Sequence, residues 1–366
     1  MNTWAKKLTI CQVLLVAAVI LLIFKRRYIS YTINYARLII DAVAKDQQRT
    51  EDNSFLLAQI EWEYHRLQVQ YMEKICENRR LVDKEYTWLT ALVNDEYVLP
   101  GIVLGHSIRT LSCVRNMLAL VSDEVGHSGL KALAKVGWDV KVVSAMDCRW
   151  MERRLGRMPS GKGILGTHTR FHAWNYTQYS KIVYTDPDYM LLTNIDELFE
   201  VPADFAATYC ARPGIVDPCF NAGLLVFRPD FYDYENIMNM WKTISEESCP
   251  NDQVLLWHYY ADRGRWKPLS FAYNVRRVIH RPMKAFHFAC CPPPKPWKQR
   301  CRPSRDEARS YDHPITNVRE VSLVYWKKFY EALKTYQLEN WWKKNKYYNS
   351  EVEFGKRLYR ECWKEE

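Results

Sequence analysis

Residues 182–200 read IVYTDPDYMLLTNIDELFE, in which an apolar run leads to Asp186, Pro187 and Asp188 before apolar residues resume. Successive side chains of an extended segment point to opposite faces, so the two aspartates face the same side. Pro187 ends the strand ladder at that point because it has no N–H to donate. Two carboxylates at the carboxyl end of a core strand are typical of a Mg²⁺ or Mn²⁺ site shared with ligand phosphates. The alternative is a pair of ordinary turn aspartates.

Segments on both sides of this strand alternate between strand and helix patterns. Alternation of this kind predicts a mostly parallel sheet covered by helices on both faces, which is an α/β fold. The sequence predicts a strand, a turn and a helix within 86–109, a strand at 117–125, a helix and a strand within 130–147, a helix at 169–180, and a core strand at 220–230.

The N-terminus differs in composition from the rest of the chain. An uncharged apolar run at 8–24 lies between Lys6-Lys7 and three basic residues at 25–27. Its length is at the lower limit for spanning a bilayer, so residues 1–27 are predicted to form an N-terminal transmembrane signal anchor. A cleaved signal peptide and a buried core helix are the alternatives.

The sequence between the apolar run and the main domain, and that at the C-terminal end, predicts helices and one long loop. Residues 28–85 have apolar positions three to four apart on a polar background, which predicts a helical stem. A proline-rich basic segment at 292–305 predicts a loop. Residues 301–366 are predicted to be a C-terminal helical extension packed on a main domain at 86–300.

Net charge narrows the classes of binding partner, and the cysteine pattern bears on disulfide bonding. The net charge of +10 favours anionic partners. Lysine and arginine are spread along the chain and no zinc-finger or RNA-binding signature appears, so nucleic acid is not expected as a partner. The 11 cysteines are scattered and include no CxxC pair, which argues against a dense disulfide framework and leaves open a few disulfides.

Five segments in a fixed order resemble glycosyltransferase family 8, whose glycogenin-like members are the most similar. The resemblance covers about residues 86–297. It implies a GT-A type fold, a single nucleotide-binding α/β domain, and retaining transfer of a sugar from a nucleotide sugar, usually UDP-linked, with Mn²⁺. The segments are LTALVNDEYVLPGIVLGHSIR (89–109), HAWNYTQYSKIVYTDPDYMLLTNIDELFE (172–200), FNAGLLVFRPD (220–230), NDQVLLWHYY (251–260) and HFACCPPPKPW (287–297).

The resemblance assigns roles to residues around the two aspartates. Asp186 and Asp188 resemble the metal-binding aspartates of the family, and His287 resembles the third metal ligand. A buried core histidine between two phenylalanines is the alternative for His287. Asn94 and Tyr97 look like the residues that hold the uracil and the ribose.

The same resemblance predicts the residues around the donor sugar and its phosphates. Lys295 looks like a lysine that contacts the diphosphate, and a lysine and an arginine beside a metal would stabilise the charge on the leaving UDP. Asp252, Gln253 and Arg170 are the predicted catalytic residues, with Asp252 as the candidate nucleophile if retention uses a covalent intermediate rather than front-face attack. A helix cap is the alternative for Asp252, and a solvated loop residue for Lys295. Further predicted donor-site residues are Asn221, Ala222 and Pro187.

Several positions depart from the family pattern. Arg170 stands where relatives usually carry a lysine, Val93 replaces a hydroxyl residue, and Cys249 replaces an acidic one. These departures leave open a catalytically inactive scaffold of the same fold. A D-x-D phosphohydrolase is a weaker alternative, since such enzymes carry Thr or Val where this chain has Met190. Asp196 is expected to be a surface or capping residue away from the metal.

The function predicted on these grounds is that of a membrane-anchored, metal-dependent retaining glycosyltransferase. It would move a sugar from a UDP-sugar to a glycan, glycolipid or protein acceptor. The resemblance favours a single-pass type II protein of the Golgi or another secretory membrane, although the charges flanking the apolar run lean toward the opposite orientation. Homodimer formation is a further expectation.

Overall fold

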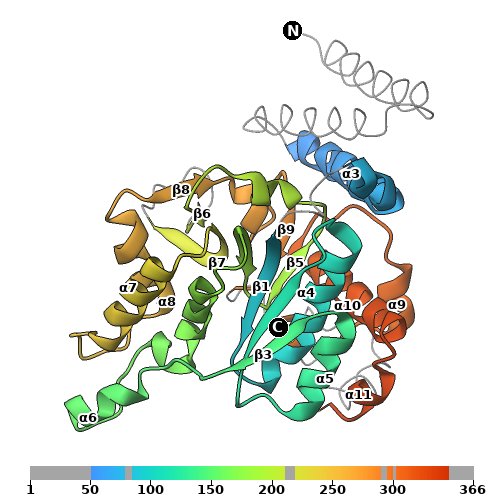
Figure 1. Cartoon of the computed structure of the whole chain (residues 1–366). Helices are drawn as coiled ribbons and strands as arrows, with labels where there is room; N and C mark the ends of the chain where they lie inside the picture. The colour runs from blue at the N-terminus through green and yellow to red at the C-terminus, as the bar shows by residue number, and fades with distance from the viewer. Residues whose placement is uncertain (1–50, 79–84, 211–218, 290–294, 300–301, 346–366) are drawn as a thin grey trace.

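The computed structural model of the chain describes residues 51–78, 85–210, 219–289, 295–299 and 302–345. A central seven-stranded sheet has the strand order β3-β2-β1-β4-β7-β6-β8, and helices lie on either side of it (Figure 1). Its strands are β1 (Tyr86–Leu92), β2 (Met117–Ser122), β3 (Asp139–Val143), β4 (Lys181–Thr185), β6 (Phe205–Tyr209), β7 (Phe220–Phe227) and β8 (Trp266–Leu269).

The sheet is mostly parallel, as the alternating pattern predicts. Strands β3, β2, β1 and β4 form one parallel block, and β6 and β8 pair in parallel. Strand β7 runs antiparallel to both β4 and β6. The α/β expectation is therefore confirmed, with one reversed strand next to the strand that ends in the two aspartates.

Alternate residues of β4 enter two separate hydrophobic cores. Val183 packs with α4 (Val98–Leu111), α5 (His127–Val136) and α10 (Val318–Thr335). Ile182 and Tyr184 pack in the other core, which includes residues of α7 (Phe231–Lys242) and α8 (Asp252–Leu256). Shorter helices complete the outer layers: α6 (Glu152–Leu155), α9 (Arg305–Ser310), α11 (Glu339–Lys343) and a π-helix at Trp257–Ala261.

One predicted helix has a different geometry and different bounds. The segment expected at 169–180 is a 3₁₀ helix at Thr167–Asn175. Among its buried side chains, the aromatic rings of His168, Phe171 and Trp174 are three residues apart, which matches three residues per turn rather than 3.6. This tighter helix places Arg170 at the carboxyl edge of the sheet.

A second, two-stranded sheet is central to the site. Strand β5 (Tyr189–Leu191) pairs antiparallel with β9 (Ala285–His287), so that Tyr189 lies opposite His287. Because β5 follows the two aspartates directly, this pairing brings a residue about one hundred positions away beside them. Sequence periodicity gives no signal for a pairing over that distance.

Helix α3 (Glu51–Asn78) lies within the segment predicted to be a stem, and it packs on the domain. It contacts α4, and a disulfide joins Cys76 near its end to Cys113. Two further disulfides, Cys148–Cys249 and Cys210–Cys219, answer the question that the scattered cysteines left open. Cys249, which stands where relatives carry an acidic residue, is thus bonded rather than available to a ligand.

The predicted single-pass membrane localisation is contradicted. Among the residues that the structure describes, no helix combines the length and the apolar character that crossing a bilayer requires. The longest of them, α3, carries charged residues along its length. The predicted anchor at 1–27 lies outside the described residues.

Asp196 corrects another expectation, because it is buried rather than a surface or capping residue. Its carboxylate accepts hydrogen bonds from the Ser112 hydroxyl at 2.6 Å, the Cys113 backbone N–H at 2.7 Å and the Asn194 amide at 2.7 Å. These contacts tie the segment after β5 to the end of α4. Asp196 is therefore a structural residue of the domain.

We expect Asp196→Ala to lower the free energy of unfolding by about 3 kcal/mol, since three buried donors would lose their acceptor. Equilibrium denaturation in urea measures this change. Asp262→Ala is the matched control, because Asp262 is about half exposed and pairs with His258 one helical turn away. Equal stability of the two variants would contradict the structural role of Asp196.

Candidate active site

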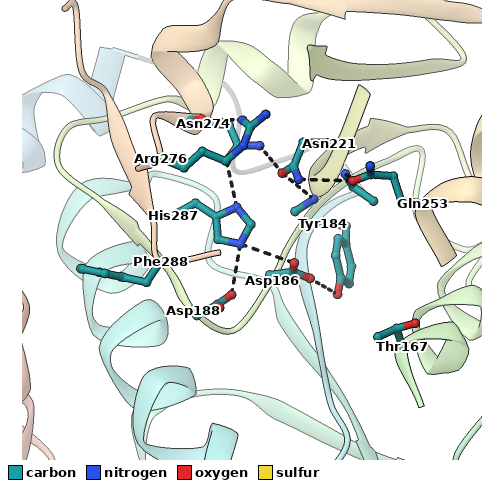
Figure 2. A network of polar contacts seen from close by, with 12 residues as sticks. Thr167, Tyr184, Asp186, Asp188, Asn221, Gln253, Asn274, Arg276, His287 and Phe288 are labelled. Atoms are coloured by element: carbon teal, nitrogen blue, oxygen red, sulfur yellow. Dashed lines mark hydrogen bonds and ion pairs between the residues drawn. The ribbon is translucent and has the colours of Figure 1, made fainter. Parts of the chain in front are cut away.

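The two aspartates occupy a tight turn at the end of β4. The Asp186 backbone N–H donates to the Gly223 carbonyl of β7 at 3.0 Å, and the Tyr189 N–H donates to the Asp186 carbonyl at 3.1 Å. Pro187 between them is buried. Both carboxylates point to the same side of the chain (Figure 2), as alternation along the strand predicts.

His287 completes a cluster of three potential ligands. Its Nε2 lies 3.2 Å from Asp188 Oδ1 and 3.5 Å from Asp186 Oδ2 (Figure 2). One ligand atom from each residue lies within 4.8 Å of the others. A side chain at Gly223 would overlap the His287 ring, so the glycine of FNAGLLVF is required for this close approach.

Charged neighbours keep this cluster ionised despite its burial. Burial alone would raise the pKa of Asp186, but Arg170 and His287 lower it below its ordinary value. Burial also opposes ionisation of Asp188, yet Lys295 and His287 hold the pKa of that carboxyl well below its usual range. The cluster therefore presents two carboxylates at neutral pH, which is the form that binds a metal.

Asn274 sets the orientation of the His287 ring. The Asn274 amide nitrogen donates to Thr208 Oγ1 at 3.0 Å and to Asn221 Oδ1 at 2.8 Å. Its oxygen therefore faces His287 Nδ1, 3.0 Å away, and accepts the proton on that nitrogen. In the neutral ring this leaves the lone pair of Nε2 directed at the aspartates, an arrangement common among metal-binding histidines.

Arg170 joins the cluster to the start of α8. Its guanidinium lies 2.8 Å from Asp186 Oδ1 and 3.1 Å from Asp252 Oδ2, and it donates to the Ala222 carbonyl at 2.6 Å. It also lies over the Tyr184 ring, 4.8 Å from the centroid. A lysine at this position would have a single ammonium and could not hold both carboxylates in this planar geometry.

Residues from β7 and α8 meet on the other side of Arg170. The Gln253 side-chain oxygen accepts from the Ala222 backbone N–H at 3.0 Å and from the Asn221 amide at 3.3 Å. Asn251 caps α8 by accepting from the Val254 N–H, which fixes Asp252 in its first turn. Burial raises the pKa of Asp252, against the opposing effect of Arg170.

Lys295 approaches the cluster from the proline-rich segment. Its ammonium contacts the Asp188 carboxylate and donates to the Phe288 carbonyl at 3.0 Å. It also lies 5.7 Å from the centroid of the Tyr97 ring, and burial raises the pKa of Tyr97 to about 12. Asn94 differs from the other predicted residues, because its side chain caps the 3₁₀ helix at Asp95–Tyr97 by accepting from the Glu96 N–H.

Contacts thus link eleven of the twelve predicted residues in one series at the carboxyl edge of the sheet, from Tyr97 through Lys295 to Asn221. Asn94 lies at the same edge, where β1 ends. Residues 89–301 match the sequence model of Glycosyl transferase family 8, which is more than half of the chain. The chain belongs to glycosyltransferase family 8. Its α/β fold is of the GT-A type, as the resemblance implies.

Three curated relatives show how far the similarity to family 8 extends. Mouse glycogenin-1 is 34% identical over 208 residues, which cover 55% of this chain and 60% of the relative. Human glycogenin-1 is 28% identical over 258 residues, 66% of this chain and 71% of the relative. Inositol phosphorylceramide glucuronosyltransferase 1 of Arabidopsis thaliana is 31% identical over 175 residues, 48% of this chain and 30% of the relative.

The residues of this family 8 chain fit a divalent metal at the cluster. Within the described part of the chain, His287 Nε2 is buried without a well-aligned hydrogen bond, although it faces both carboxylates. Two ionised oxygen ligands and one imidazole suit a hard or borderline divalent ion such as Mn²⁺. Arg170 and Lys295 pair with the carboxylates of the site and offset part of their negative charge.

Three residues of the site escaped the sequence analysis of this family 8 chain. Tyr184 donates its hydroxyl to Asp186 Oδ1 at 2.9 Å, and its position two residues before Asp186 on the strand could have indicated this. Thr167 lies beside the Asp252 backbone N–H at 3.5 Å. Asn274 lies 13 residues from His287 in a segment without periodic pattern, so no local signal pointed to it.

Proposed function

We propose that this chain transfers a sugar from a UDP-sugar to a glycan, glycolipid or protein acceptor, with retention at the anomeric carbon and with Mn²⁺ or a similar divalent metal. The observation that carries the proposal is the cluster of Asp186, Asp188 and His287 at the carboxyl end of β4, in which Asp188 and His287 are buried. The family membership of the chain supports the reaction type. The name of the Arabidopsis relative supports a glycolipid among the acceptor classes.

The proposed roles follow from where each charge lies. A divalent metal held by Asp186, Asp188 and His287 would neutralise the diphosphate of the donor when bound. Lys295, on the Asp188 side, would pair with the phosphate that leaves with UDP. Arg170 would keep Asp186 oriented and ionised while holding Asp252 beside the donor sugar.

Residues further from the metal would hold the two ends of the donor. Tyr97 offers an aromatic face for the uracil, and Asn94 lies at the start of the same helix. Asn221 and Gln253, joined by a hydrogen bond, would bind hydroxyls of the sugar. Asp252 is the proposed carboxylate at the reacting carbon. Burial raises the pKa of Asp252, whereas the neighbouring Arg170 favours the ionised form that this role requires.

We also propose that the unit needed for transfer is larger than the predicted domain at 86–300. Helix α10 shares the hydrophobic core of α4 and contacts the 3₁₀ turn that contains Trp297. Helix α3 is bonded to the domain through Cys76–Cys113. Homodimer formation stays a prediction.

The proposal is tested by incubating the purified protein with a panel of UDP-sugars with and without Mn²⁺. We expect one UDP-sugar to raise the melting temperature only when Mn²⁺ is present, and to release UDP under the same conditions. Matched GDP-sugars serve as the control for the base. Binding without any UDP release would favour the inactive scaffold, and phosphate release from simple esters would favour a phosphohydrolase.

A further inference from the structure

Helix α3 lies outside the region that matches family 8, yet it places two buried polar side chains against the domain. Glu61 is 3% exposed and Gln68 is 4% exposed. A separation of seven residues puts both on one face of the helix, two turns apart. Buried polar groups of this kind need partners, and the partners show what the helix holds.

Both side chains bind the segments that flank the small β5–β9 sheet, at its end remote from the metal cluster. The Glu61 carboxylate accepts from the Met283 backbone N–H at 2.6 Å, just before β9, and pairs with Arg281. The Gln68 oxygen accepts from the Asn194 backbone N–H at 2.8 Å and from the Thr193 hydroxyl, just after β5. Helix α3 therefore holds the segment next to one strand with each residue.

The opposite end of this sheet carries two of the three proposed metal ligands. His287 is the last residue of β9, and Asp188 directly precedes β5. Each strand has three residues, which span only about 10 Å. A two-stranded ladder of this length has little stability of its own, so its register depends on what holds its far end.

We infer that α3 is a positioning element for the metal site, with Glu61 and Gln68 as its positioning residues. By supplying acceptors to two buried backbone N–H groups, it fixes the register of β5 against β9. This in turn sets the separation of Asp188 and His287. The inference rests on the proposed function, because it takes this cluster to be the metal site.

The test is a Mn²⁺ titration of the full chain, read by the EPR signal of free Mn²⁺ and therefore independent of turnover. Gln68→Met removes the acceptor at nearly constant volume, and Glu61→Gln removes the charge but keeps an oxygen for Met283. We expect Gln68→Met to raise the Kd for Mn²⁺ about tenfold, as loss of outer support does in metal sites, and Glu61→Gln to raise it less. Matched controls on the exposed face of α3 are Gln70→Met and Glu63→Gln, which should leave the Kd unchanged.

Two outcomes separate this inference from the proposed function. If Gln68→Met and Glu61→Gln lower the melting temperature but bind Mn²⁺ as the wild type does, α3 only adds stability and the inference is overturned, whatever the turnover. If the wild type binds Mn²⁺ but releases no UDP, the proposed function fails, while a weaker Kd in the two variants still supports the positioning role.

Discussion

Asp188→Asn is expected to slow UDP-sugar turnover about a thousandfold while leaving the protein folded. Asparagine keeps the shape of the side chain but removes the negative charge that would hold the metal and that now pairs with Lys295. Metal stabilisation of a leaving diphosphate is worth several kcal/mol, and a loss of about 4 kcal/mol corresponds to this factor. The measurement is UDP release against Mn²⁺ concentration, with thermal unfolding recorded in parallel.

His287→Ala should lose less activity and regain part of it at high Mn²⁺, because two carboxylates remain. Asp262→Asn is the matched control, since Asp262 is about half exposed and directly follows the π-helix at Trp257–Ala261. Asp196→Asn is unsuitable as a control because Asp196 is buried. Near-normal turnover in Asp188→Asn would mean that the two aspartates form only a turn.

Arg170→Ala is expected to reduce turnover by at least about a hundredfold and to lower the melting temperature as well. The substitution leaves the buried carboxylate of Asp252 and the partly buried one of Asp186 without their shared partner. Breaking such a buried pair lowers the free energy of unfolding by about 3–5 kcal/mol. Losing one preorganised charge near the reacting groups typically slows the reaction by a factor of roughly 10²–10³. Activity should therefore be measured well below the melting temperature.

Arg170→Lys separates charge from geometry. Lysine keeps the positive charge but can reach only one of the two carboxylates, so we expect intermediate turnover and a nearly normal fold. Arg228→Ala is the control, because Arg228 is exposed. If Arg170→Lys were as active as the wild type, the double ion pair would have no part in catalysis, and the arginine would merely replace the usual family lysine.

The local features of this fold were predictable because each depends on neighbours in the sequence. Gly137 ends α5 with a φ of 112°, which glycine adopts without strain. Asn94 begins a turn by capping it, as its residue type favours. The common orientation of Asp186 and Asp188 follows from strand geometry alone. The family motifs then supplied the more distant members of the site.

The features that were missed depend on contacts between distant segments. Two of the three partners of the buried Asp196 carboxylate lie 83 and 84 positions earlier in the chain. Cys249 forms a disulfide with Cys148, 101 residues away. Asn274 is recognisable only after β9 has placed His287 beside it. No periodicity or turn propensity reports on such pairs, which follow from the tertiary structure.

The attachment of α3 also affects when the metal cluster can form while the chain is being synthesised. Glu61 leaves the ribosome 220 residues before its partner Arg281, which at typical rates of 5–20 residues per second is a wait of roughly 10 to 45 s. During that interval Glu61 has no partner, and β5, once made, has no partner strand until β9 follows. The metal cluster therefore forms only when the last third of the nascent chain arrives. A translation product that ends before Arg281 would lack β9 and both partners of Glu61.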